Sequence, residues 1–147
     1  MAARSLACYL AADDEVDTYA IVERAWRAKK RIFAPVVDFR GRMVFRELLR
    51  ETELETNSFG LWEPNDGAMI SPNRLDIVIT PVVAFDDAGH RVGMGGGYFD
   101  RCFAFLAHRN HWFHPKLIGL AFDCQKIEKI LSNPWDIGLY RVFTESG

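Results

Sequence analysis

Four glycines fall within five residues of the stretch RVGMGGGYFDR, which runs from Arg91 to Arg101. Glycine has no Cβ atom, so such a loop lets an anion approach the backbone and permits the positive φ angles at which successive N–H groups converge. The following segment, 98–106, has the apolar pattern of a helix, and a helix N-terminus offers further unpaired N–H groups to an anion. The spacing therefore predicts a loop that binds phosphate.

Asp100 falls in the first turn of this predicted helix, beside the expected anion. A carboxylate repels a phosphate unless a cation lies between them, and Mg²⁺ would remove that repulsion. A plainer explanation stays open, in which the glycines only form a tight turn and Asp100 complements the helix dipole. Two familiar motifs are excluded, because a dinucleotide fingerprint needs glycine where Tyr98 stands and a P-loop needs Gly-Lys-Ser/Thr.

The elements that must position this loop alternate between strands and helices. Strands are expected at 5–11, 31–37, 42–48, 75–85, 116–122 and 141–144, with Pro81 interrupting the fourth. Helices are expected at 18–28, capped by Asp17, and at 98–106, with a short turn of helix near 125–131, and 51–71 is expected to be a long loop. The strand–helix–strand order implies parallel pairing with a right-handed crossover. Residues 1–147 are thus predicted to form one α/β domain of three layers, an open, mostly parallel sheet with helices on both faces.

Three polar segments follow predicted strands: the acidic run that contains Glu15, the glycine loop, and Asp123–Gln125. Ligands of open parallel sheets bind beyond the carboxyl ends of the strands, so we expect these segments to share one edge of the sheet. The acidic run also has a simpler role in capping the first helix, which explains Asp17 but does not require the other carboxylates.

The composition restricts the partners of the chain. With 18 basic and 20 acidic side chains, the net charge of −2 argues against nucleic acid as a bulk electrostatic partner. No apolar run approaches the roughly 18 residues of a membrane span. Cys8, Cys102 and Cys124 are odd in number and form no C-x-x-C pair, which favours buried thiols in a reducing cytoplasm. We expect small-molecule substrates and a monomer.

The stretch from Leu75 to Arg101, LDIVITPVVAFDDAGHRVGMGGGYFDR, resembles the signature region of the 5-formyltetrahydrofolate cyclo-ligase family, also called methenyltetrahydrofolate synthetases. The strand, Pro81, the Gly89 turn and the glycine loop fall in the order of that family. Further segments are similar to other parts of the family, namely Tyr9–Thr18, Phe59–Pro64, Ile118–Gln125 and Trp135–Ile137. Family members begin with an additional basic helix that reaches the ATP phosphates. Because this chain goes almost directly into its first predicted strand, we expect it to be shortened at the N-terminus.

The resemblance implies an activity. Members of the family convert 5-formyltetrahydrofolate to 5,10-methenyltetrahydrofolate with ATP and Mg²⁺, and release ADP and phosphate. The formyl oxygen would attack the γ-phosphorus, and N10 would then close the ring as phosphate leaves. Such chemistry depends on positioning and on spreading charge, which suits a glycine loop with nearby cations.

The resemblance also implies the site residues. Catalysis would fall to Arg91, Tyr98 and Asp100, and Mg²⁺ would be held by Asp100 and Asp136. The ATP site would consist of Arg91, Val92, Gly93, Met94, Gly95, Gly96, Gly97, Tyr98 and Phe99. The folate site would consist of Leu10, Glu15, Phe59, Met94, Gly95, Gly96, Gly97 and Tyr98. The Glu15 carboxylate would accept hydrogen bonds from the pterin edge and Phe59 would flank the ring, whereas Trp62 is expected to be a core anchor.

Two alternatives belong to other functional classes. The first is a relative of the family that binds nucleotide or folate without turnover, since the basic helix is missing from the sequence. The second is a regulatory α/β module associated with RNA, against which the composition offers no extended basic surface.

Overall fold

Residues 3–12, 15–93, 97–108 and 115–147 are described by a computed structural model of the chain. Its strands are β1 (Ser5–Cys8), β2 (Arg31–Val37), β3 (Met43–Glu47), β4 (Leu54–Thr56), β5 (Trp62–Pro64), β6 (Met69–Ile70), β7 (Ile77–Pro81), β8 (Ala84–Phe85), β9 (Arg91–Val92), β10 (Lys116–Leu120) and β11 (Arg141–Phe143). Its α-helices are α1 (Tyr19–Arg27) and α2 (Tyr98–Cys102), and its 3-10 helices are η1 (Pro72–Arg74), η2 (Ala104–His108) and η3 (Asp123–Gln125). No helix within these ranges has the length and apolarity that crossing a membrane requires.

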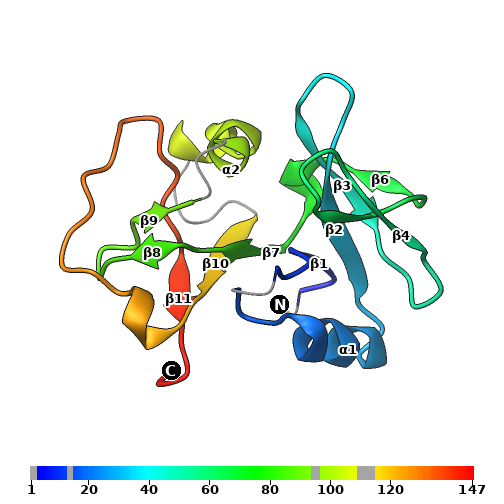
Figure 1. The fold of residues 1–147 in the computed structure, drawn as a ribbon, viewed down its shortest axis with the longest axis horizontal. Coiled ribbons are helices and arrows are strands. Elements are labelled where there is room, and N and C mark those ends of the chain that lie inside the picture. The colour runs from blue at the N-terminus through cyan, green and yellow to red at the C-terminus, as the bar shows by residue number, and fades with distance from the viewer. Residues whose placement is uncertain (1–2, 13–14, 94–96, 109–114) are drawn as a thin grey trace.

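A seven-stranded sheet forms the centre of the fold, in the order β11-β10-β7-β1-β2-β3-β6 (Figure 1). The first five strands of this order pair in parallel, and β3 pairs antiparallel with both β2 and β6. The prediction of a mostly parallel sheet is confirmed. β1 and β2 pair in parallel across α1, as their strand–helix–strand order indicates.

The sheet is covered on both faces. Successive side chains of a strand point to opposite faces, and the central strand β1 contributes apolar side chains to both. Leu6 and Cys8 of β1 join an apolar cluster with Val22 of α1, whereas Ala7 between them joins a cluster on the opposite face with Phe103, which follows α2. Figure 1 shows α1 and α2 on opposite sides of the sheet. The predicted three-layer α/β arrangement is therefore confirmed.

The first predicted helix is confirmed with small changes at its ends. The helix α1 begins at Tyr19, one residue later than expected, and ends at Arg27. The prediction that Asp17 is the N-cap is wrong by one residue, because Thr18 occupies that position and its side chain makes no capping bond. The Asp17 carboxylate, one residue earlier, accepts the N–H of Tyr19 at 3.0 Å. The Thr18 hydroxyl instead donates to the Tyr9 carbonyl at 2.8 Å, which ties the start of α1 to the end of β1.

The expectation of a long loop at 51–71 is wrong, because β4, β5 and β6 lie within it. These strands have two or three residues each, too few to show a period in the sequence. Side chains hold the turn between β4 and β5. Asn57 Oδ1 accepts the N–H groups of Phe59 at 2.9 Å and Leu61 at 3.0 Å, and the buried Glu63 accepts the N–H of Val37 at 2.9 Å.

The predicted strand 75–85 is two strands. The ladder of β7 stops at Pro81, which lacks the N–H needed to continue it, and β8 pairs with β9 in a separate hairpin. The short turn of helix predicted near 125–131 forms earlier in the chain, as η3 at 123–125. The N–H groups of Ile127 and Ile130 donate to the Phe85 carbonyl and the Asp86 carboxylate, so they are not available to a helix. Similarly, the helix expected at 98–106 divides into α2 and η2.

Candidate active site

Arg91 and Asp100 meet across the glycine loop. Arg91 lies in β9 before the loop and Asp100 in α2 after it, and Nη2 of Arg91 is 3.7 Å from Oδ1 of Asp100. The Arg91 side chain is 7% exposed, and its guanidinium lies 5.3 Å from the ring centroid of Phe99. A Cβ at Gly93 would lie 2.6 Å from Nη1 of Arg91, so glycine at this position leaves the room that the guanidinium occupies.

The buried guanidinium has donor capacity that the protein does not use. Nε of Arg91 is inaccessible to solvent and has no hydrogen-bond partner among the described residues. Burial lowers the pKa of Arg91, while the nearby carboxylates of Asp100 and Asp136 act to raise it. A buried, unpaired N–H on a cation is costly unless a ligand accepts from it, and guanidinium groups match phosphate oxygens well. The residues around Arg91 can therefore receive an anion.

Asp100 is fixed by a residue far along the chain. Its Oδ1 accepts the N–H of Ile137 at 3.0 Å, from the loop that carries Asp136. Asp136 Oδ2 accepts the N–H of Asn133 at 2.8 Å. Figure 1 shows this loop, in orange, rising from η3 toward α2. The structure thus brings Arg91, Asp100 and the segment of Asp136 together, as the predicted ATP and metal residues require.

The donor set of Asp100 and Asp136 fits Mg²⁺ in a particular way. Within the described ranges, no group of three or more His, Cys, Asp or Glu side chains is placed to hold a metal ion. Mg²⁺ differs from most protein-bound metals in that one or two carboxylates suffice when nucleotide phosphates and water complete its shell. The two aspartates therefore suit a metal that arrives with phosphate.

Two of the predicted folate residues are neighbours. The rings of Phe59 and Tyr98 meet edge to face with their centroids 6.5 Å apart, although the residues come from the β4–β5 turn and the start of α2. Phe59 is 64% exposed, so much of its ring is free to contact a ligand. The Arg101 guanidinium lies 5.0 Å from the Tyr98 centroid. Gly97, which directly precedes Tyr98, has the positive φ of 67° that the glycine loop predicts.

Leu10 and Glu15 lie in the segment after β1. Leu10 packs against the apolar cluster on the α1 face, and Glu15 Oε1 accepts the N–H of Ala12 at 2.7 Å. These contacts hold the segment in place, and the roles of Leu10 and Glu15 in the folate site stay predictions. Met94, Gly95 and Gly96 lie outside the described residues.

Trp62 is not the core anchor that the sequence suggests. It is 53% exposed in β5, whereas its neighbour Glu63 is buried. Because side chains alternate along a strand, the hydrogen bonds of Glu63 to Val37 and Asn57 turn Trp62 outward. Trp62 lies between Gly60 and Pro64, two residue types that are common in turns. This position is the sequence signal from which the exposure of Trp62 could have been expected.

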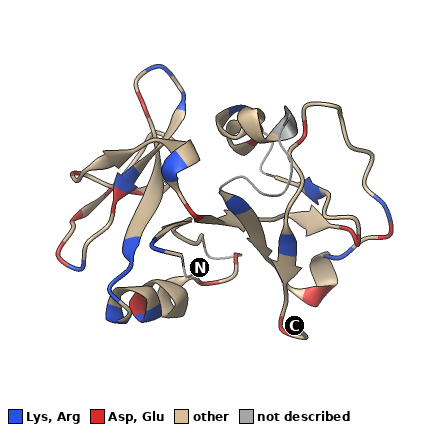
Figure 2. Cartoon of the chain, turned by 180° about the vertical axis from the view of Figure 1, so that it is seen from behind, with Lys and Arg blue, Asp and Glu red and all other residues tan. Residues whose placement is uncertain are grey.

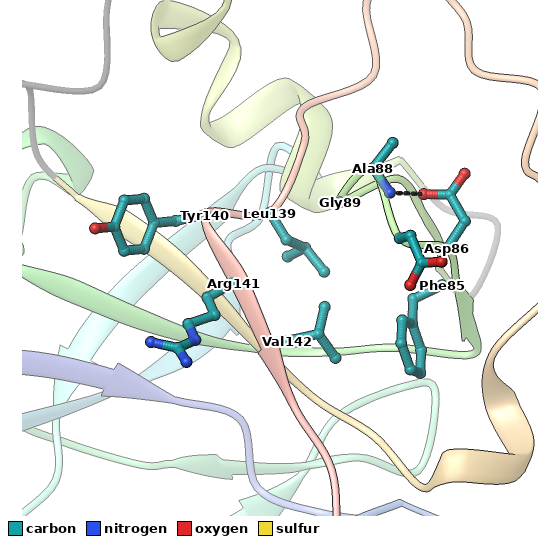
Figure 3. A pocket seen from close by; sticks show the side chains of 9 residues that line it. Phe85, Asp86, Ala88, Gly89, Leu139, Tyr140, Arg141 and Val142 are labelled. Carbon is teal, nitrogen blue, oxygen red and sulfur yellow. Dashed lines mark hydrogen bonds between the residues drawn. The ribbon is translucent and has the colours of Figure 1, made fainter. Parts of the chain in front are cut away.

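A separate hollow of about 290 Å³ lies beside the β8–β9 turn and β11. Figure 3 shows its lining, including the bond from the Ala88 N–H to the Asp86 carboxylate, which measures 3.0 Å. The lining residues are Phe85, Asp86, Asp87, Ala88, Gly89, Leu139, Tyr140, Arg141 and Val142. None of the predicted site residues that the structure describes lines this hollow.

Known proteins are similar to this chain along nearly its whole length. The sequence profile of the 5-formyltetrahydrofolate cyclo-ligase family matches residues 1–145. The 5-formyltetrahydrofolate cyclo-ligase of Escherichia coli (strain K12) is 40% identical over 150 residues, which cover 98% of this chain and 79% of that protein. The enzyme of that name from Haemophilus influenzae is 36% identical over 144 residues, or 95% of this chain and 75% of that one.

The fold has a solved counterpart as well. The NMR structure of Aquifex aeolicus 5,10-methenyltetrahydrofolate synthetase superposes with a TM-score of 0.80 at 26% identity, covering 99% of this chain and 70% of the other. The chain belongs to the 5-formyltetrahydrofolate cyclo-ligase family. The resemblance found in the sequence is thereby confirmed.

Proposed function

We propose that this chain catalyses the ATP-dependent conversion of 5-formyltetrahydrofolate to 5,10-methenyltetrahydrofolate, with release of ADP and phosphate. Membership of the cyclo-ligase family supports both the reaction and the co-substrate. The observation that carries the proposal is the buried Arg91, whose Nε lacks a partner beside Gly93 and Asp100. An anion that accepts a hydrogen bond from a buried, unpaired donor removes the cost of leaving that donor unsatisfied. The gain in binding free energy is therefore larger here than at an exposed cation, which water already hydrates.

At the phosphate part of the site, Arg91 would donate to the γ-phosphate and offset the charge that builds up as the formyl oxygen attacks phosphorus. ADP leaves with the electron pair of the broken bond. N10 then adds to the formyl carbon and loses its proton, and phosphate departs with the former formyl oxygen. Val92, Gly93, the loop 94–97 and Phe99 would surround the nucleotide, so the protein supplies orientation rather than a covalent intermediate.

Asp100 and Asp136 would hold Mg²⁺ on the nucleotide phosphates. When bound, the ion would neutralise phosphate charge. The chain itself fixes the Asp100 carboxylate through the Ile137 N–H, which donates to Oδ1, and Nη2 of Arg91 lies 3.7 Å from the same oxygen.

At the folate part of the site, Tyr98 and Phe59 would contact the flat ring system, and Glu15 would accept hydrogen bonds from the pterin edge. The edge-to-face contact of Phe59 with Tyr98 supports this assignment. It brings aromatic surface from two segments that are distant in the sequence together beside the glycine loop. Leu10, which follows β1 as Glu15 does, would line the same pocket.

The remaining proposals concern the state of the protein. We propose that it acts as a monomer on small molecules and not on nucleic acid, in line with its net charge of −2. The expectation of buried thiols holds for Cys8 but is wrong for Cys124, which is exposed, while Cys102 is partly buried. We propose a reducing compartment such as the cytoplasm because the three cysteines are odd in number and form no C-x-x-C pair.

The test is to follow methenyltetrahydrofolate by its absorbance after 5-formyltetrahydrofolate is mixed with the protein, with and without ATP and Mg²⁺. We expect product only when both are present. Binding of ATP and folate by calorimetry without product would favour the binding protein without turnover. Binding to RNA that persists at high salt, without product, would favour the RNA-associated module.

A further inference from the structure

Asp86 is a buried carboxylate outside the site just described. It follows β8, is 4% exposed, and begins the turn that leads to β9. Its Oδ1 accepts the N–H groups of Ala88 and His90, each at 3.0 Å. Its Oδ2 is 3.0 Å from Nδ1 of His90 and accepts the N–H of Ile130 at 3.0 Å. One oxygen therefore organises the turn, and the other reaches a segment more than forty residues away.

The bond to Ile130 is one of two anchors of a loop. We call residues 131–138 the C-terminal loop. Ile130, just before the loop, is held by Asp86. Leu139, just after it, donates its N–H to the Gly89 carbonyl at 2.8 Å. Gly89 has a φ of 84°, and a Cβ there would lie 2.8 Å from the Leu139 carbonyl oxygen, so the two backbones approach as closely as glycine permits. Both ends of the loop are thus fixed to the β8–β9 turn.

The second half of the C-terminal loop carries a proposed metal ligand and the donor that fixes the other one. Asp136 lies there, and the N–H of Ile137 fixes Asp100. At the other end of the turn, His90 directly precedes Arg91. The Asp86 carboxylate is therefore linked to Arg91 through the turn and to Asp100 through the loop.

From this arrangement we infer that Asp86 is a positioning residue, which holds Asp100 and Asp136 against Arg91 by anchoring the C-terminal loop to the β8–β9 turn. The inference rests on the proposed function. Nothing in it requires Asp86 to touch substrate, since its side chain is 3% exposed and its oxygens are already occupied.

Asp86→Asn tests the loop anchor selectively. The amide oxygen can replace Oδ1 and keep the bonds to Ala88 and His90 in the turn. The amide N–H₂ then stands where Oδ2 stood and cannot accept from the Ile130 N–H, because both are donors. Neutral His90 can accept from the amide, so the turn keeps its bonds while the loop loses its anchor.

We expect Asp86→Asn to raise the KM for ATP about 10- to 100-fold, the usual effect of removing a group that orients metal ligands, and to leave the KM for 5-formyltetrahydrofolate within about threefold. A merely structural role would lower the active fraction of the protein, which lowers kcat and leaves both KM values unchanged. Asp87→Asn is the matched control, because the adjacent Asp87 is exposed and its carboxylate contacts Lys126. The control should behave as the parent protein, and an unchanged KM for ATP in Asp86→Asn would overturn the inference.

Amide hydrogen exchange tests the loop anchor in the parent protein, and the result does not depend on whether the protein is catalytically active. If the anchors make the loop one unit, the amides of Ile130, Ile137 and Leu139 should exchange within about threefold of one another. Exchange of Ile137 more than about tenfold faster than Ile130 would show a loop that opens while its anchor is closed, which contradicts the inference. An inactive parent protein with these amides exchanging together would contradict the proposed function but not the anchor.

Discussion

The phosphate and folate parts of the proposed site differ in how much of their geometry exists before a ligand binds. In the phosphate part, the Arg91 side chain is 7% exposed, Asp100 is held by the Ile137 N–H, and the segments involved are tied to the β8–β9 turn. In the folate part, Phe59 is 64% exposed and its ring meets the Tyr98 ring edge to face. Phosphoryl transfer depends on charges that are already in position, whereas a flat ring can complete its own slot by stacking.

The largest expected effect is at Asp100. Asp100→Asn can still accept the Ile137 N–H, so the loop stays in place, but the charge that attracts Mg²⁺ is lost. We expect kcat to fall by more than about 100-fold, and metal-free ATP to bind at least as well as to the parent. The measurement is turnover in an Mg²⁺ titration at fixed ATP.

Asp38→Asn is the control for this change, since Asp38 also accepts backbone N–H groups, from Arg40 and Arg42, in another part of the molecule. Superimposable Mg²⁺ curves for the parent and Asp100→Asn would show that Asp100 only complements the dipole of α2.

The next largest effect is expected at Arg91, where a substitution should weaken ATP binding without lowering the thermal stability of the protein. Arg91→Met keeps the apolar stem and removes a buried cation, so thermal stability should be unchanged or higher. ATP affinity by calorimetry should fall about 10- to 100-fold, the effect of losing charge-assisted hydrogen bonds. Arg141→Met removes an arginine that lies over the Phe143 ring and serves as the control. Normal ATP affinity in Arg91→Met would remove Arg91 from the phosphate part.

A smaller effect is expected in the folate part. Phe59→Ala should raise the KM for 5-formyltetrahydrofolate about two- to tenfold, because an aromatic contact contributes about 0.5–1.5 kcal/mol. The KM for ATP should not change. Phe39→Ala, at a ring that is 92% exposed, is the control. A change in ATP kinetics as large as that in folate kinetics would show that the two parts are not built independently.

The smallest effect is on acid stability. Burial acts to raise the pKa of Asp86, but the Ile130 N–H and His90 outweigh it and lower the pKa from 3.8 to about 2. A carboxyl with a lowered folded pKa stabilises the fold above its unfolded pKa, and this contribution is lost as the pH falls through the folded pKa. The stability difference between the parent and Asp86→Asn in urea should therefore shrink between pH 4 and pH 2. A difference independent of pH would mean that the carboxylate charge is not what stabilises the turn.

The parts of the fold that the sequence predicts are those with long apolar patterns or turn chemistry. β2 is predicted to the residue, and the chemistry of the glycine loop correctly indicates positive φ at Gly97. Short strands such as β4 and β6 escape prediction because three or two residues are too few to show an alternating pattern. The sequence suggests Asp100 as a site residue, but not the Ile137 N–H that fixes it. A backbone donor leaves no trace in residue types, and only the folded chain shows where it points.

The bond between Ile137 and Asp100 also has a consequence for synthesis of the chain. The two residues are 37 positions apart, so a ribosome adding about 5–20 residues per second completes Asp100 a few seconds before Ile137. β11, which pairs with β10, is made later still. A nascent chain at that stage carries Arg91 and Asp100 but not the N–H that fixes the carboxylate. Translation order therefore delays the completed phosphate part until nearly the whole domain has been made.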